Sequence, residues 1–140
     1  MLNKIQRMDL QGKKLLTINE KYYVADHGLR DALLGNKPKD IGQILENIIC
    51  IELLRRGYKV AVGKLGNLEI DFIAQKNEKT MYLQVSYLLA DENTVAREFG
   101  AYSKIKDNYP KYVLSLDDFD FSRDGIIHEN IRHFLLREDW

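Results

Sequence analysis

Apolar and polar residues alternate over two neighbouring stretches in the middle of the chain, on either side of the polar turn at residues 76–79. Side chains alternate between the two faces of a strand, so this pattern predicts strands over residues 68–74 and 81–88. One face of the first strand is expected to carry three apolar side chains, namely Ile70, Phe72 and Ala74. Asp71 is expected on the other face, in the centre of a strand that is apolar enough to be buried.

A helix over residues 41–56 is predicted by apolar positions that surround most of its circumference. Asp40 is a suitable N-cap for this helix, and Gly57 is a suitable end. At 100° per residue Glu46 falls directly above Leu53, within the apolar stripe rather than on the solvated face. The helix is therefore expected to be largely buried and to carry one inward carboxylate.

The other elements follow from shorter patterns along the chain. They are a hairpin within residues 5–18, a strand at 21–25, a helix at 28–34, strands at 58–63, 111–116 and 126–131, and helices at 93–106 and 133–138. From residue 40 the order is helix, strand, strand, strand, helix, strand, which indicates an α/β fold with a central mixed sheet flanked by helices. The helix between the third and fourth of these strands predicts that the two strands are parallel. Residues 1–39 are interpreted as an N-terminal extension and residues 40–140 as the core of one compact domain.

Composition narrows the classes of function. The chain has 140 residues, and its 21 Lys and Arg balance 21 Asp and Glu, so no global field attracts nucleic acid. Cys50 is the single cysteine, which excludes a disulfide framework and favours a reducing, cytoplasmic compartment. No apolar run approaches the ~20 residues of a membrane span. No P-loop pattern GxxxxGK(S/T) is present, so no ATP site is assigned to this chain.

Three polar side chains are placed by these patterns where they could converge: Glu46 from the helix, Asp71 from the hairpin and Gln84 from the next strand. A buried carboxylate is costly unless it is paired, hydrogen-bonded or bound to a metal. Oxygen ligands of this kind suit Mg²⁺ or Mn²⁺, which would activate water and offset charge on a phosphate. Each residue also has a structural alternative: an ion pair for Glu46, a hydrogen-bonded strand acid for Asp71 and a structural amide for Gln84.

The same residues carry a resemblance to known proteins. An inward Glu46, followed by Glu69-Ile70-Asp71 on a hairpin and Gln84-Val85-Ser86 on the next strand, resembles the restriction-endonuclease-like core of the PD-(D/E)xK superfamily. Residues 21–30, 42–52, 63–72 and 84–87 resemble more closely one group of prokaryotic domains. In that group a C-terminal domain of unknown function follows an AAA-type ATPase module. The resemblance covers nearly the whole chain.

The resemblance implies roles for four residues. Glu46 would be the helix acid, Asp71 the first metal acid and Gln84 the second acid position, and all three would be metal ligands. Ser86 falls where active nucleases have a lysine. Gln84 lowers the negative charge of the site, and Ser86 cannot orient water or stabilise the charge that develops on the phosphate. Losing a positioned proton-transfer group commonly costs ~10²–10⁴-fold in rate.

The implied function is a degenerate or weakly active nuclease-like module, accessory to an AAA-type ATPase, that engages DNA or a partner protein. Two alternatives stay open at this point. One is an active Mg²⁺-dependent DNA nuclease in which another group replaces the missing lysine. The other is a purely structural or protein-interaction domain, in which Glu46 and Asp71 serve only to specify the fold.

Overall fold

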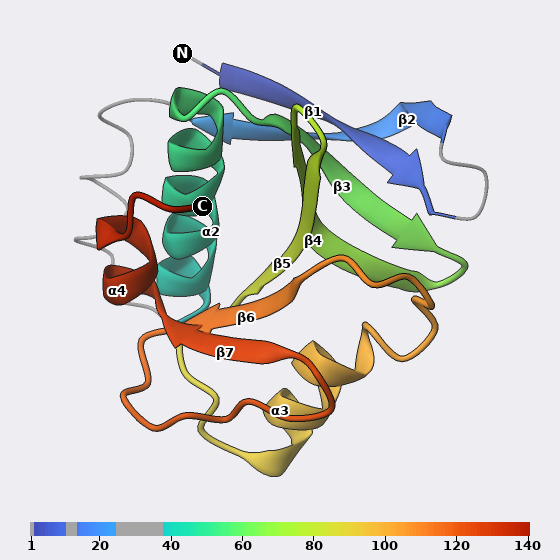
Figure 1. Cartoon of the computed structure of the whole chain (residues 1–140). Helices are drawn as coiled ribbons and strands as arrows, with labels where there is room; N and C mark the ends of the chain where they lie inside the picture. The colour runs from blue at the N-terminus through green and yellow to red at the C-terminus, as the bar shows by residue number, and fades with distance from the viewer. Residues whose placement is uncertain (1, 11–13, 25–37) are drawn as a thin grey trace.

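Strands dominate the computed structural model, which describes residues 2–10, 14–24 and 38–140 (Figure 1). Within this part of the chain one mixed sheet has the strand order β2-β1-β3-β4-β5-β6-β7. The strands are β1 (Leu2–Asp9), β2 (Lys14–Val24), β3 (Lys59–Leu65), β4 (Leu68–Lys76), β5 (Lys79–Val85), β6 (Lys111–Ser115) and β7 (Ile127–Asn130). The helices are α2 (Pro38–Arg55), α3 (Glu92–Gly100) and α4 (Ile131–Leu136). The predicted class, α/β with a mixed sheet flanked by helices, is confirmed.

The sheet is antiparallel in its middle and parallel towards β7. Strands β3, β4 and β5 form an antiparallel meander, and β5, β6 and β7 then run parallel to one another. The connection from β5 to β6 contains α3, so the predicted parallel crossover is confirmed. Parallel strands put their carboxyl ends at one edge of the sheet, and this places the end of β5 beside the end of β6.

The predicted N-terminal hairpin is confirmed by the antiparallel pair β1 and β2. The short strand expected at 21–25 is not separate, because β2 continues without a break from Lys14 to Val24. The helix expected at 28–34 lies outside the described residues. Strand β1 also pairs in parallel with β3, from Arg7 opposite Val62 to Asp9 opposite Lys64, so the hairpin extends the central sheet.

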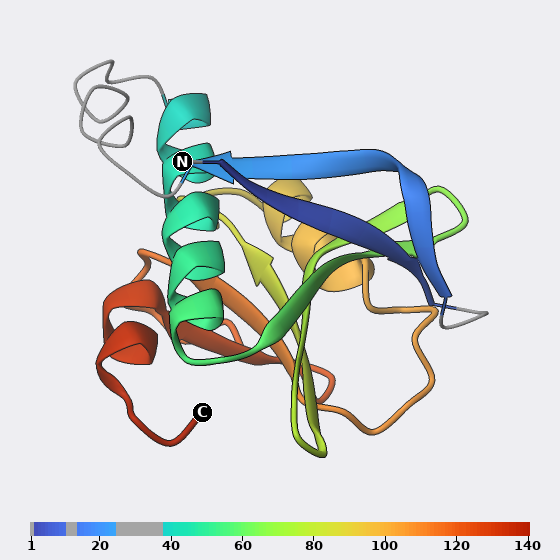
Figure 2. The ribbon, with the colours of Figure 1, turned by 90° about the horizontal axis from the view of Figure 1, so that it is seen from above.

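Helices α2 and α3 lie on opposite sides of the sheet (Figures 1 and 2), and a separate apolar cluster lies beneath each of them. One cluster contains Ile49 and Leu53 of α2 together with Phe134 of α4. The other contains Val95 and Phe99 of α3. In the described residues no helix is both long enough and apolar enough to cross a membrane.

Helix α3 ends at Gly100, whereas the apolar pattern predicted a helix to residue 106. Beyond Gly100 the backbone continues in single turns with hydrogen bonds three residues apart, such as Ser103 N to Gly100 O and Ile105 N to Tyr102 O. Glycine is a poor helix former, which accounts for the early end. The closing helix starts at Ile131, earlier than expected, because the Asn130 side chain accepts the N–H of Arg132 at 2.9 Å and caps it.

A β-bulge interrupts β4 at the residues of greatest interest. Opposite the step from Ala61 to Gly63 in β3, β4 advances from Ile70 to Ile73, so it holds one extra residue. Simple alternation placed Ile70 with Phe72 and Ala74 on one face, and that prediction is wrong. Ile70 and Ile73 belong to the cluster beneath α3, whereas Phe72 and Ala74 belong to the cluster beneath α2. Asp71 alternates with Phe72 and therefore lies on the α3 side, as Gln84 does beside Leu83 in β5.

Gly63 allows β3 and β4 to approach each other at this bulge. A Cβ at this position would lie 3.0 Å from Ile70 Cβ and 3.2 Å from Ile73 side-chain atoms. These neighbours are branched and buried, so they have little room to move away. The glycine therefore supports the close packing beside Asp71.

The last residues of the chain close the cluster beneath α2. Trp140 stacks on Phe134 with ring centroids 4.3 Å apart and an interplanar angle of 15°. The guanidinium of Arg56 covers Trp140 with its Cζ 3.7 Å from the ring centroid, and it also donates to the Leu135 carbonyl at 2.9 Å. The Trp140 indole N–H donates to the Phe134 carbonyl. Arg56, the residue after α2, thus connects the end of that helix with α4 and the C-terminal segment.

Candidate functional site

The structure brings Asp71 and Gln84 together, side by side on β4 and β5. The Asp71 backbone N–H donates to Gln84 Oε1 at 2.7 Å. In return, Asp71 Oδ2 accepts the backbone N–H of Val85 at 2.8 Å. Each side chain thus accepts a backbone N–H of the neighbouring strand just beyond the last regular β4–β5 pair, Phe72 opposite Leu83, and we call this arrangement the Asp71–Gln84 lock.

The lock is more enclosed on the β5 side than on the β4 side. Gln84 is buried, and Asp71 is half-buried. A buried amide is stable only when its polar atoms have partners, and the Asp71 N–H supplies one for the amide oxygen. Ser86 follows just beyond the end of β5 and is half-exposed, with its backbone N–H on the Leu114 carbonyl at 2.9 Å.

Glu46 lies on α2, half-buried, and acts electrostatically on two neighbours. Burial raises the pKa of the Cys50 thiol to about 12, and the charge of Glu46 contributes to that shift. The charge of Glu46 also helps to raise the pKa of Glu98 on α3. The inward position predicted for Glu46 is therefore consistent with the structure, and it leads to an acid that the sequence patterns did not single out.

Glu98 and Tyr102 are the residues that the motif-based reasoning missed. Glu98 is buried, and burial raises the pKa of its carboxyl group, against the lowering effect of Arg97. Tyr102 is buried beneath the site, where burial raises the pKa of its hydroxyl group and the charges of Asp71 and Glu98 raise it further. These interactions place Asp71, Glu98 and Tyr102 in one neighbourhood on the α3 side of the sheet.

The signal for Glu98 was present in the sequence. Val95, Phe99 and Tyr102 recur at helical spacing, and Glu98 falls inside that apolar stripe because it is one turn after Val95. The same reasoning that singled out Glu46 in the first helix applies to Glu98 in this one.

The oxygens of Asp71 and Gln84 that could bind the divalent cation suggested by the sequence already have hydrogen-bond partners. The Gln84 amide oxygen and one Asp71 carboxylate oxygen each accept a backbone N–H, so part of their lone-pair capacity is already used. Among the described residues, no three His, Cys, Asp or Glu side chains gather where they could hold a metal ion. An octahedral Mg²⁺ site needs oxygens that are turned towards a common point. In this arrangement Asp71 and Gln84 direct these two oxygens at backbone N–H groups rather than at a common point.

Glu69 forms an ion pair with Arg7 of β1. This contact crosses β3 and ties the N-terminal hairpin to the strand that carries Asp71. Glu69 therefore has a structural partner and is not part of the lock.

A second polar network lies at the carboxyl end of β6. The Phe121 N–H donates to His128 Nδ1 at 3.1 Å, so the neutral ring carries its proton on Nε2 and donates it to Ser115 Oγ at 2.8 Å. The Ser115 hydroxyl donates in turn to Asp117 Oδ2 at 2.7 Å. Burial lowers the pKa of His128, which keeps the ring neutral.

This network is structural although its residue types match those of a hydrolase triad. Ser115 is fully buried, and its proton points to the carboxylate rather than to the imidazole. A serine nucleophile needs the opposite direction, with the imidazole as proton acceptor. Asp117 Oδ2 also accepts the Leu89 N–H at 2.7 Å, so the network joins the loop after β5 to the loop after β6.

Replacing Asp71 tests whether it serves the fold. Asp71→Ala leaves the Val85 N–H without its acceptor and is expected to destabilise the protein by about 1–3 kcal/mol. Asp71→Asn keeps an oxygen in the same place and should cost less than about 1 kcal/mol. Urea unfolding of the three proteins measures both values. Catalytic acids commonly lower stability, so an Asp71→Ala variant more stable than the parent would contradict the structural role.

Glu98→Gln is expected to change the dependence of stability on pH. The folded-state pKa of Glu98 is raised, so the folded protein holds this proton more tightly than the unfolded chain and loses stability as pH rises above about 4.5. Glutamine removes that loss, so the variant should exceed the parent at neutral pH and match it at about pH 4. Melting temperatures of the variant and the parent, measured across this pH range, test the prediction. A difference in melting temperature that does not change with pH would rule out the titration of Glu98 as its cause.

Comparison with known proteins finds relatives whose names describe no activity. The chain is 46% identical over 112 residues to an uncharacterized protein of Haemophilus influenzae, covering 80% of this chain and 27% of that protein. It is 39% identical over 112 residues to the uncharacterized protein MJ1544 of Methanocaldococcus jannaschii, covering 74% of this chain and 24% of that protein. The chain thus spans about a quarter of the length of these relatives. No family model and no solved structure matches it.

Proposed function

We propose that this chain is a degenerate nuclease-like module of the PD-(D/E)xK type, accessory to an AAA-type ATPase, that engages DNA or a partner without rapid phosphodiester cleavage. The observation that carries the proposal is the Asp71–Gln84 lock. An amide stands beside Asp71 where an active nuclease of this type has a second acid, and its oxygen accepts the Asp71 N–H. In this proposal the site no longer serves cleavage, and its two hydrogen bonds hold β4 against β5.

The order and pairing of the elements support the nuclease-like part of the proposal. From α2 the chain runs through β3, β4 and β5, then α3 and β6, with an antiparallel meander followed by a parallel crossover. This is the order that the resemblance implies for the core. Asp71 lies on the second strand of the meander, and Gln84 and Ser86 lie on and just after the third.

The ATPase-associated part rests on the resemblance and on the length of the relatives. Both relatives are much longer than the segment they share with this chain, which leaves room in each for other modules. A module that has lost the lysine and one acid fits an accessory role better than a catalytic one. Losing a positioned proton-transfer group costs ~10²–10⁴-fold in rate.

Plasmid cleavage tests the proposal. The purified chain is incubated with supercoiled plasmid and Mg²⁺ or Mn²⁺, beside Asp71→Asn and the matched surface control Asp118→Asn, whose carboxylate is 84% exposed. All three proteins are expected to show the same background nicking. Cleavage that Asp71→Asn abolishes and Asp118→Asn retains would show an active nuclease and end the proposal.

A further inference from the structure

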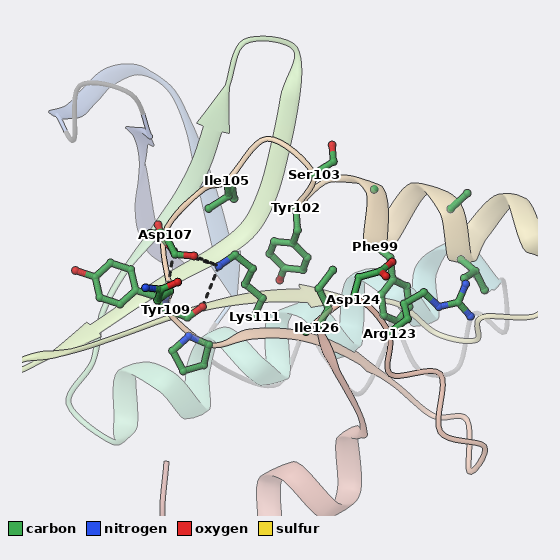
Figure 3. A pocket seen from close by; sticks show the side chains of 16 residues that line it. Phe99, Tyr102, Ser103, Ile105, Asp107, Tyr109, Lys111, Arg123, Asp124 and Ile126 are labelled. Atoms are coloured by element: carbon green, nitrogen blue, oxygen red, sulfur yellow. Dashed lines mark hydrogen bonds and ion pairs between the residues drawn. The ribbon is translucent and has the colours of Figure 1, made fainter.

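A cavity of about 760 Å³ opens between the C-terminal end of α3, the segment before β6 and the turn at residues 123–126 (Figure 3). Phe99, Tyr102, Tyr109, Lys111, Arg123 and Ile126 contribute to its lining. Figure 3 shows Tyr109 at one end and Arg123 at the other. Asp71, Gln84 and Glu98 do not line it, so this cavity is distinct from the lock.

A second cavity of about 330 Å³ lies along the other side of the same segment. It is lined by Lys104 and Lys106 among others, and it shares Ile105 and Asp107 with the first cavity. Ile105 and Asp107 border both cavities, and we call this segment together with the cavities on its two sides the 103–110 groove.

The groove carries a surplus of positive charge although the whole chain is neutral. Asp107 and Lys111 neutralise each other, with Lys111 Nζ 3.1 Å from Asp107 Oδ1 and the Tyr82 hydroxyl donating to Asp107 Oδ2 at 2.5 Å. The exposed charges that remain in the lining are cationic Lys104, Lys106 and Arg123 and anionic Asp124, which leaves a surplus of two.

An aromatic ring is held in place at one end of this charged groove. Tyr109 is 44% exposed, and its ring packs edge-on against Tyr82 with centroids 6.3 Å apart. Its backbone N–H donates to Asp107 Oδ1 at 3.1 Å, and Pro110 follows it, so the turn that presents the ring is fixed. An exposed ring of this kind offers a surface on which a planar group can stack.

The cation at the other end is also fixed. Arg123 lies with its Cζ 5.1 Å from the centroid of the Phe99 ring. The turn that carries it is closed by hydrogen bonds between Arg123 and Ile126 in both directions, with positive φ at Asp124 and Gly125. This geometry belongs to a tight hairpin turn, and Arg123 Nε donates to the Phe121 carbonyl at 3.2 Å, which helps to hold the side chain beside Phe99.

We propose that the 103–110 groove binds single-stranded nucleic acid. Tyr109 stacks on one base and Arg123 contacts a phosphate in the first cavity, and Lys104 and Lys106 contact phosphates where the strand crosses the segment to the second cavity. A cationic groove with an exposed aromatic platform is the arrangement that binds single strands without sequence preference. An acidic peptide would use the cations but has no base to stack on Tyr109. The inference goes beyond the proposed function, because it assigns a surface outside the lock.

Fluorescence anisotropy of a labelled oligothymidylate of about 12 nucleotides measures the binding constant K and tests the proposal. The titrations contain EDTA and are repeated at potassium chloride concentrations from about 50 to 300 mM. About three phosphate contacts predict that log K falls with log salt at a slope of about −2. Arg123→Ser and Lys104→Ser should each reduce the magnitude of this slope by about 0.7. Tyr109→Leu should weaken binding about tenfold and leave the slope unchanged.

Two matched controls separate the groove from general surface effects. Lys59→Ser removes an exposed lysine that lines neither cavity, and Phe119→Leu removes a ring that is 70% exposed elsewhere. Both should bind like the parent. The proposal is overturned if Tyr109→Leu behaves like Phe119→Leu, if polyglutamate of equal charge binds as tightly as the oligonucleotide, or if about 1 mM protein gives no binding. Because EDTA excludes metal-dependent cleavage, none of these outcomes depends on the nuclease assay.

Discussion

A chain that carries both Gln84→Glu and Ser86→Lys is expected to cleave plasmid DNA with Mn²⁺ about 10²–10⁴-fold faster than the unchanged chain. The first change adds a carboxylate beside Asp71 and retains an oxygen that can accept the Asp71 N–H. The second places an ammonium group just after β5, two residues along and therefore on the same face by alternation. Together they supply the two groups that the proposed degenerate site lacks.

The gain in cleavage rate must depend on Asp71, the first acid of the proposed site. Adding Asp71→Asn to the double variant should return cleavage to background, and Gln84→Glu alone should recover little, because it still lacks the lysine. Circular dichroism confirms that each variant is folded. A folded double variant that cleaves no faster than the parent would show that positions 84 and 86 do not belong to a nuclease-like site.

Trp140→Ala is expected to destabilise the protein by about 3–5 kcal/mol. The indole is 8% exposed and has a ring on one face and the Arg56 guanidinium on the other, so its removal leaves a cavity between α2 and α4. A domain of this size is stable by only about 5–15 kcal/mol, so the loss is a large part of the total. Urea unfolding at 25 °C measures it.

Trp140→Phe is the control for this prediction. It keeps the stacking on Phe134 and loses the indole hydrogen bond to the Phe134 carbonyl, so it should cost much less than the alanine change. If Trp140→Ala unfolds at nearly the same urea concentration as the parent, the C-terminal segment does not contribute to the core as the structure indicates.

Local pattern was enough to predict the class of fold and most of its elements. The apolar faces of α2 and the alternation in β4 and β5 are strong signals, and a helix between two strands implies a parallel pair. The pairing of β1 with β3 was not predictable in this way, because it joins residues far apart in the chain. The bulge in β4 was also missed, since one extra residue leaves no mark on the hydrophobic pattern but reverses the face of Ile70.

The sequence predicted which residues form the candidate site but not which hydrogen bonds they make. The patterns placed Asp71 and Gln84 on neighbouring strands, and the structure brings them into contact. Which atoms they bond was not predictable, because each side-chain oxygen accepts a backbone N–H of the neighbouring strand beyond the regular β4–β5 pairs. Glu98 could have been predicted from its position in the stripe of Val95 and Phe99, whereas its coupling to Glu46 required the placement of both helices.

Calorimetric titration of Mn²⁺ into the parent chain and into Asp71→Asn tests the central claim most directly, because it asks whether the Asp71–Gln84 lock is a metal site without requiring a substrate. Asp71→Asn keeps the oxygen that accepts the Val85 N–H, so both proteins should be folded. The account predicts that the two titrations are the same, with no binding at millimolar Mn²⁺ that depends on the Asp71 carboxylate. Binding by the parent that disappears in Asp71→Asn would contradict it and would show that the lock opens to hold a cation.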